Sequence, residues 1–135
     1  MKTLDMRFIR YLNLFEKVTR VRTKNCFMYN NTLIFVTPRE MISRAIGENG
    51  QNVRRLSEII GRKIKVISFA QDNVYEFIER VVEPIRFKSI EISHDSIIIN
   101  AGKQSKAALI GRNKARLDEL NHIVKEYFNK ELKII

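Results

Sequence analysis

The sequence predicts an α+β protein in which one structural unit occurs twice. Sliding the 135-residue chain by 64 positions lays residues 31–60 over residues 95–124 without a gap. In each copy, segments with the helical spacing of apolar residues alternate with short runs of β-branched and aromatic residues, which is the pattern of mixed helices and strands. Two copies of one supersecondary design indicate one task performed at two adjacent places.

The aligned positions of the two copies carry identical residues or residues of the same chemical type at many places. Beyond residue 60 the second copy needs four more residues before residues 64–67 match residues 132–135. We therefore expect two domains, residues 1–70 and 71–135, each near the lower size limit for an independent core. Only residues 70–72 join them, so we expect the domains to be rigidly packed. The matched pairs include Leu33 with Ile97, Ile46 with Ile110, Gly47 with Gly111, Asn49 with Asn113, Leu56 with Leu120 and Ile59 with Ile123.

The first half of the first copy reads as a helix and a hairpin. Residues 4–16 carry apolar side chains at the helical spacing, and residues 18–24 form a polar connector. Residues 26–29 and 32–37 are predicted strands. Asn30 and Asn31 lie between them, and asparagine tolerates the left-handed backbone of a tight turn.

The second half of the first copy reads as two helices and a strand. Pro38 favours a helix start, and the first of these helices is predicted at residues 39–46. The next helix ends at Gly61 and turns Val53, Leu56, Ile59 and Ile60 inward. A strand is expected at residues 63–69. The unit is thus α-β-β-α-α-β.

The second copy repeats that order. Asn73 is a good N-cap with Glu76 three residues later, and Pro84 ends the helix after Val82. The remaining expected elements are strands at residues 87–92 and 96–100, a helix at 103–110, a long helix to about residue 128 and a strand from Leu132.

The candidate functional site is the junction between the two later helices of the first copy. Gly47 and Gly50 leave no β-carbon where a phosphate backbone could approach, and the next helix begins there with unpaired N–H groups. Such a glycine pair also marks an ordinary helix end, so the repeat is what gives it weight. We expect the loop residues and three flanking cations to bind a nucleic-acid backbone: Ile46, Gly47, Glu48, Asn49, Gly50, Arg44, Arg54 and Arg55.

The second junction lacks the final glycine. If its last position needs a positive φ or a close approach of the strand, Lys114 weakens the clamp; otherwise its cations add a phosphate-seeking cluster. We expect this loop to be auxiliary to the first. Its candidate binding residues are Ile110, Gly111, Arg112, Asn113, Lys114 and Arg116.

The charge distribution favours a polyanionic partner. The net charge is +10, and residues 1–70 hold 14 Lys/Arg against 5 Asp/Glu, whereas residues 71–135 hold 11 against 10. A basic excess suits nucleic acid first, and an acidic protein surface or an anionic membrane second. The attraction is concentrated in the first copy.

The sequence lacks the residue patterns typical of membrane, secreted, metal-binding and catalytic proteins. No apolar run approaches the roughly 20 residues of a membrane helix, and no secretion signal opens the chain. Cys26 is the only cysteine, which agrees with a reducing compartment, so we expect a cytoplasmic protein. His94 and His122 have no metal-ligand spacing around them, and no catalytic constellation can be assembled. We expect no enzyme activity, cofactor or metal.

The α-β-β-α-α-β unit with Ile46-Gly47 and Gly50 between its later helices resembles a type II KH domain. Two in tandem, filling so short a chain, resemble the small archaeal NusA-like transcription proteins. The resemblance covers essentially the whole chain. It implies that the loop backbone grips an extended single strand of RNA, and it makes Ile46 a candidate for the apolar groove beside the loop, with a place in the core as the alternative. It further implies a role in transcription termination or antitermination, with RNA polymerase or other transcription machinery as a further partner.

Two alternatives remain at this point. One is a KH protein of the ribosome or of RNA processing, and the other is a module that docks on proteins of the transcription machinery through degenerate KH folds. Glu48 favours the second alternative, because a carboxylate facing phosphate is unfavourable, although by no more than about 1 kcal/mol when exposed. Under the RNA hypothesis, replacing Gly47 and Gly50 by Asp should abolish most binding and leave the fold intact.

Overall fold

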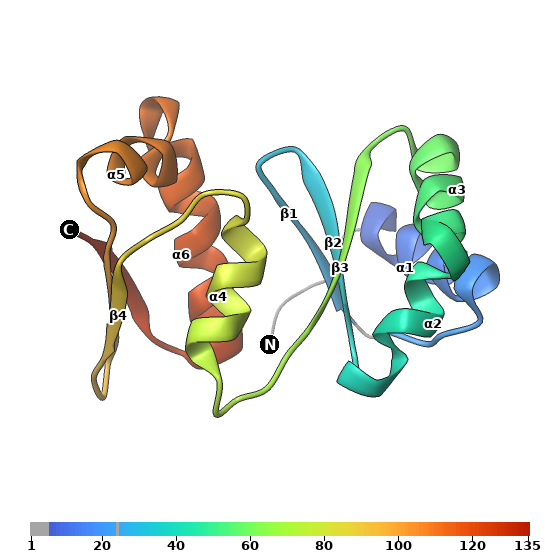
Figure 1. Cartoon of the computed structure of the whole chain (residues 1–135), viewed down its shortest axis with the longest axis horizontal. Helices are drawn as coiled ribbons and strands as arrows, with labels where there is room; N and C mark the ends of the chain where they lie inside the picture. Colours follow the sequence, from blue (N-terminus) through green and yellow to red (C-terminus); the bar gives the residue numbers. More distant parts are fainter. Residues whose placement is uncertain (1–5, 24) are drawn as a thin grey trace. The chain divides into compact units, whose positions relative to one another are not determined.

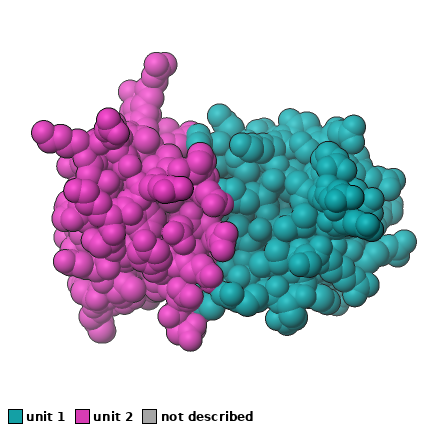
Figure 2. All heavy atoms as spheres, in the orientation of Figure 1, with its two compact units in different colours: residues 1–70 teal, residues 71–135 magenta. Residues whose placement is uncertain are grey.

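A three-stranded mixed sheet forms the centre of each half of the chain (Figure 1). The computed structural model describes residues 6–23 and 25–135. In the first sheet, β1 (Asn25–Tyr29) pairs antiparallel with β2 (Thr32–Thr37), and β2 pairs parallel with β3 (Lys63–Ser68). The chain divides into two compact units, residues 1–70 and 71–135, coloured separately in Figure 2.

The helices of the first unit all lie on one face of its sheet (Figure 1). They are α1 (Met6–Thr19), α2 (Ile42–Ile46) and α3 (Gln51–Ile60). Two short 3-10 turns, η1 (Arg39–Met41) and η2 (Glu48–Gly50), precede α2 and α3. The predicted order of elements is therefore confirmed for this unit.

The second unit has the same order. Its sheet pairs β4 (Ser89–Ile92) antiparallel with β5 (Ser96–Asn100), and β5 parallel with β6 (Glu131–Ile134). Its helices are α4 (Val74–Val82), α5 (Lys103–Ile110) and α6 (Ala115–Phe128), with the 3-10 turn η3 (Arg112–Lys114) before α6.

The 64-residue offset of the sequence repeat holds in three dimensions. β2 and β5 begin at Thr32 and Ser96, and the paired helices α2 and α5 end at Ile46 and Ile110. The offset becomes 68 at the last strands, because α6 has 14 residues where α3 has 10. The predicted four-residue insertion is about one additional helical turn.

The core of the first unit lies between its helices and its sheet. Phe15 of α1 stacks on Phe35 of β2 with ring centroids 4.3 Å apart, and both are fully buried. Leu33, Ala45 and Leu56 pack in the same cluster. Each large buried side chain contributes about 1.5–3 kcal/mol, so this contact fixes α1 and α3 against the sheet.

Several predicted local features are confirmed. Asn30 and Asn31 have φ of 51° and 60° in the β1–β2 turn. Gly61, at φ 77°, ends α3 in the left-handed conformation. The Asn73 side chain accepts a hydrogen bond of 3.1 Å from the Glu76 backbone N–H at the start of α4, which ends at Val82 as predicted.

Three expectations about the elements were wrong. The first helix continues to Thr19, because Val18 packs against the core cluster and Thr19 is buried, with its hydroxyl donating to the Phe15 carbonyl at 2.7 Å; the expected start at residue 4 lies outside the described residues. Residues 39–46 form a 3-10 turn and a short helix rather than one helix. β4 begins at Ser89, two residues later than predicted, and the Phe87 ring instead contacts Tyr75, 5.2 Å between centroids.

Ile59 was expected to face inward, and this expectation was also wrong. Its side chain is 53% exposed, whereas Leu56 is fully buried. Ile59 lies about 100° around the helix from Ile60, beyond the stripe that the sheet covers. The counterpart Ile123 on the longer α6 is buried, so the two helices differ in the width of their apolar face.

We expect the Cys26 thiol to be inert in the folded protein. Burial raises the pKa of Cys26 to about 12 from its usual 9.0, so the reactive thiolate is suppressed at neutral pH. A thiol reagent at pH 8 should label the protein only after urea is added, while a Ser93→Cys variant, whose new thiol is exposed, should label at once. The pKa of Cys26 is higher in the folded protein than in the unfolded chain, so burial of the neutral thiol contributes to the free energy of unfolding. That contribution should be fully present below pH 9 and decline from pH 9 toward pH 12. Rapid labelling of the native parent protein would contradict the packing described.

Candidate nucleic-acid interface

The loop between α2 and α3 has a backbone that demands glycine at its first position. Gly47 ends α2 by donating its N–H to the Ser43 carbonyl at 3.0 Å. Its φ of 82° and ψ of 164° fall in a region that is essentially restricted to glycine. Asn49 (φ 56°, ψ 27°) and Gly50 (φ 71°, ψ 19°) then adopt the left-handed conformation before α3 begins.

The loop between α5 and α6 repeats this backbone. Gly111 has φ 75° and ψ 171°, Asn113 has φ 55° and ψ 31°, and Lys114 has φ 62° and ψ 21°. The Gly111 N–H donates to the Ala107 carbonyl at 2.9 Å, as its counterpart does in the first loop. The fourth position therefore has a positive φ in both loops, and Lys114 adopts it at a cost of roughly 1–2 kcal/mol.

The two glycines of the first loop have different physical roles. A β-carbon on Gly47 would lie 2.9 Å from Cγ and Nδ2 of Asn52 and 3.1 Å from its backbone nitrogen. A β-carbon on Gly50 would meet only Nη1 of Arg54, at an ordinary 3.7 Å. Gly47 is thus required for the loop to close, whereas Gly50 faces open space. The expectation that Asp at both positions leaves the fold intact is wrong for Gly47.

Two residues whose packing role the sequence did not reveal fill the space beside the first glycine; Asn52 was not a candidate, and Arg116 was expected only as a phosphate contact. Asn52 lies there in the first loop, and its Nδ2 donates to the Arg44 carbonyl at 3.3 Å, which ties α3 to α2. Arg116 lies there in the second loop, with Cγ only 2.6 Å from where a β-carbon on Gly111 would be. Both residues stand five positions after a glycine, but they differ in chemistry, so no sequence pattern marked them.

The basic side chains near the loops are not equivalent. Arg44 and Arg55 are exposed beside the first loop, while Nη1 of Arg54 donates to the Asn49 carbonyl and braces the left-handed residue. In the second loop, Arg112 and Lys114 are exposed. Arg116 forms an ion pair with Glu119 at 3.1 Å, so its charge is largely compensated.

The helix starts beside both loops are open to a ligand. No side chain caps the start of α3 or of α6, and the helix dipole is positive there. The N–H groups of Gly50 and Gln51, and of Lys114 and Ala115, already donate to carbonyls of the preceding 3-10 turns, so a ligand would use the later N–H groups of each first turn. Ile46 and Ile110, at the ends of the preceding helices, are half-buried, and Glu48 is exposed. Each loop thus combines N–H donors, an apolar neighbour and at least one free cation, which suits a phosphate backbone.

Residues 6–23 and 25–135 lack the features of two other function classes. No group of three His, Cys, Asp or Glu side chains in these ranges could hold a metal ion. Within the same ranges, no helix has both the length and the apolar character needed to cross a membrane. His94 and His122 are both exposed.

The chain is similar over most of its length to three archaeal proteins named "Probable transcription termination protein NusA". The protein of Methanococcus vannielii is 25% identical over 119 residues, covering 85% of this chain and 68% of the relative. The protein of Methanocaldococcus jannaschii is 24% identical over 123 residues, covering 88% and 67%, and that of Halococcus morrhuae is 22% identical over 130 residues, covering 94% and 93%.

The fold is also found in a solved structure. The crystal structure of APE1850 superposes with a TM-score of 0.69 at 22% identity, covering 98% of this chain and all of that one. No protein-family model matches the chain. The mixed α+β architecture with two three-stranded sheets is therefore shared with a known structure.

Substitution of the two glycines should separate their roles. Gly47→Ala places a β-carbon against Asn52 in a backbone region closed to alanine, so we expect a loss of about 3 kcal/mol or more in the free energy of unfolding. Gly50→Ala meets no obstruction and should cost only about 1 kcal/mol of left-handed strain. Urea denaturation of both variants measures the difference, and equal losses would refute the assignment.

Relief of strain at Lys114 should be measurable. Lys114→Gly relieves the left-handed strain of a residue with a β-carbon, which should raise the free energy of unfolding by about 1–2 kcal/mol. The added glycine also increases the entropy of the unfolded chain, which should lower that free energy by about 0.5–1 kcal/mol. We expect a net stabilisation of about 0.5–1 kcal/mol in urea denaturation. The control is Lys125→Gly in the α6 interior, which should lose about 1 kcal/mol.

Proposed function

We propose that this chain, an archaeal NusA-like protein, binds single-stranded RNA through the two glycine loops and acts in transcription termination or antitermination. The binding is non-catalytic: each loop holds the phosphate backbone with main-chain N–H groups, and neighbouring side chains contact the bases. The observation that carries the proposal is the matching backbone of the two loops. It persists in the second loop although a lysine there must adopt a strained conformation.

That persistence argues for a binding role over a degenerate fold. A loop serving only to connect two helices gains nothing from a lysine with a positive φ, because an ordinary turn would cost less. A lysine that projects its ammonium beside an uncapped helix start adds attraction for phosphate. The strain is therefore consistent with a ligand that the loop holds.

We propose that each unit is a type II KH domain and that the domains are residues 1–70 and 71–135. The order α-β-β-α-α-β, the mixed sheet and the glycine loop between the two later helices support this in both units. The transcriptional role comes from the archaeal relatives, each named as a probable termination protein. RNA polymerase or another part of the transcription machinery is the protein partner that this role requires, and the cytoplasm is its location.

The first loop should be the stronger of the two contacts. Arg44 and Arg55 offer exposed guanidinium groups on either side of Gly47 and Gly50, and Arg54 stabilises the loop shape. At the positions that match Arg54 and Arg55, the second unit has Asp118 and Glu119. Glu48 opposes phosphate, but an exposed carboxylate costs no more than about 1 kcal/mol.

The test is a single substitution at the open glycine. Gly50→Asp puts a carboxylate beside the helix start where phosphate would lie, and aspartate tolerates the left-handed backbone. We expect at least tenfold weaker binding of single-stranded RNA, because this carboxylate, unlike that of the exposed Glu48, lies on the half-buried fourth loop position and both repels and obstructs the phosphate. Fluorescence anisotropy at two salt concentrations measures it.

Gly61→Asp is the matched control. Gly61 has φ 77°, lies at the other end of α3, and has open space around its missing β-carbon, so the variant carries the same charge change and the same strain. It should bind RNA within about twofold of the parent. If Gly50→Asp and Gly61→Asp bind equally well, the loop is not the RNA site.

A further inference from the structure

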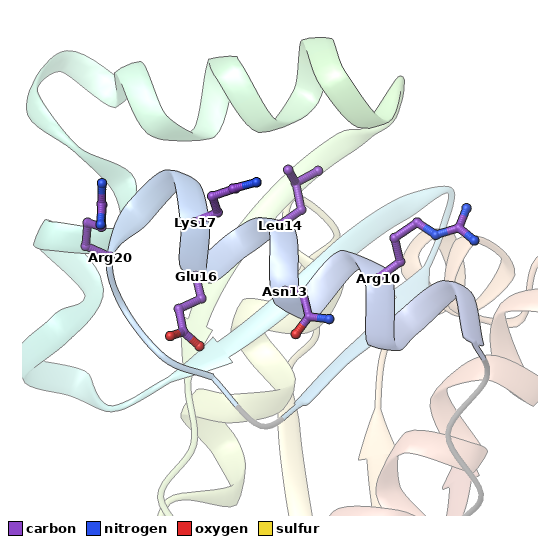
Figure 3. Close-up of a pocket in the computed structure, with 6 residues that line it drawn as sticks. All are labelled: Arg10, Asn13, Leu14, Glu16, Lys17 and Arg20. Atoms are coloured by element: carbon purple, nitrogen blue, oxygen red, sulfur yellow. The ribbon is translucent and has the colours of Figure 1, made fainter.

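A hollow of about 580 Å³ runs along the outer side of α1 (Figure 3). Three of its lining residues are cations, and one is an acid. Figure 3 shows Leu14 and Lys17 pointing toward α3, with Arg10 at one end of the helix and Arg20 at the other, while Glu16 points the opposite way. The lining residues are Arg10, Asn13, Leu14, Glu16, Lys17 and Arg20.

The positive charge of this hollow is not neutralised by its surroundings. Arg10, Lys17 and Arg20 are exposed, and among the described residues no carboxylate forms an ion pair with any of them. Glu16 is drawn toward Arg22, 3.6 Å away. Three exposed cations with a single, already paired acid attract a polyanion.

Two of the cations share one face of the helix with a leucine. Arg10, Leu14 and Lys17 stand at i, i+4 and i+7 of α1, and Arg20 follows one residue past the helix end, where its φ is 62°. From Arg10 to Arg20 the axis rises about 15 Å, over which a stacked strand at 3.4 Å per nucleotide carries about four phosphates. The partly buried Leu14 supplies an apolar floor between the charges.

The hollow is close to the first glycine loop. α1 packs against both α2 and α3, the two helices that this loop joins. In Figure 3, Arg20 lies toward the side of the unit where α2 leads into α3, and Arg10 lies farthest from it. A strand leaving the loop therefore meets Arg20 first, then Lys17 and Arg10.

We propose that this α1 hollow is a second phosphate-binding subsite, which takes the continuation of the RNA strand held by the first glycine loop. The inference rests on the proposed function and extends it from the loop, which in KH domains holds about four nucleotides, to a longer track. Arg10, Lys17 and Arg20 bind successive phosphates, and Leu14 contacts a base or ribose. Glu16 at the rim weakens the site, so Glu16→Gln should tighten binding by a few fold.

The experiment compares RNA oligomers of two lengths. A uridine tetramer reaches only the loop, whereas a dodecamer reaches both the loop and the hollow. The triple variant Arg10→Gln, Lys17→Gln, Arg20→Gln should bind the tetramer within about twofold of the parent and the dodecamer at least tenfold more weakly. Its slope of log K against log salt on the dodecamer should fall by about 2, because each single-stranded phosphate contact contributes about 0.7.

A matched triple variant controls for net charge. Lys88→Gln, Lys125→Gln, Lys133→Gln removes the same three charges at exposed positions of the second unit, and it should leave dodecamer binding within about twofold. Thermal unfolding of both triple variants checks that they remain folded. All substituted side chains are exposed, so no core contact is lost.

The outcomes separate this inference from the proposed function. If Gly50→Asp weakens both oligomers while the α1 triple variant behaves like its control, the RNA function stands and the α1 subsite is refuted. If Gly50→Asp leaves both oligomers bound as tightly as before, the proposed function fails and this inference fails with it. If the α1 variant loses binding to a polyglutamate peptide but not to the dodecamer, the hollow serves an acidic protein, which also overturns the proposal.

Discussion

The structure of each unit depends on a backbone conformation that only glycine adopts at ease. At Gly47 and Gly111 the chain leaves one helix with positive φ and extended ψ, and the residue five positions later occupies the space of the missing β-carbon. That close approach brings the start of the next helix directly against the end of the previous one. The open first turn of α3 or α6 is a consequence of this turn.

The comparison of the two loops separates what the turn requires from what it tolerates. The first position is glycine twice because a side chain would collide with the backbone nitrogen of the following helix. The fourth position is glycine in one loop and lysine in the other, because nothing blocks a side chain there and only strain opposes it. The residue type at the first position is thus fixed by packing, while the fourth position accepts a side chain at the cost of backbone strain.

Much of this architecture could be predicted from the sequence, because the repeat supplied two independent readings of each element. β2, α4 and the four-residue extension of α6 follow from spacing, turn residues and caps, which are local signals. The exposure of Ile59 could not be predicted, since it depends on how far the sheet reaches around α3. The roles of Asn52 and Arg116 were also hidden, because space filling beside a glycine leaves no mark on residue type.

The two units share a backbone but not an electrostatic environment, and this difference indicates a division of labour. Around the first loop, exposed Arg44 and Arg55 lie on the same unit as the basic hollow of α1. Around the second loop, Glu119 neutralises Arg116, and the unit as a whole is nearly balanced in charge. Under the proposed function, long-range attraction for the RNA acts mainly through the first unit. The second unit then adds a contact whose contribution comes from its loop geometry more than from its charge.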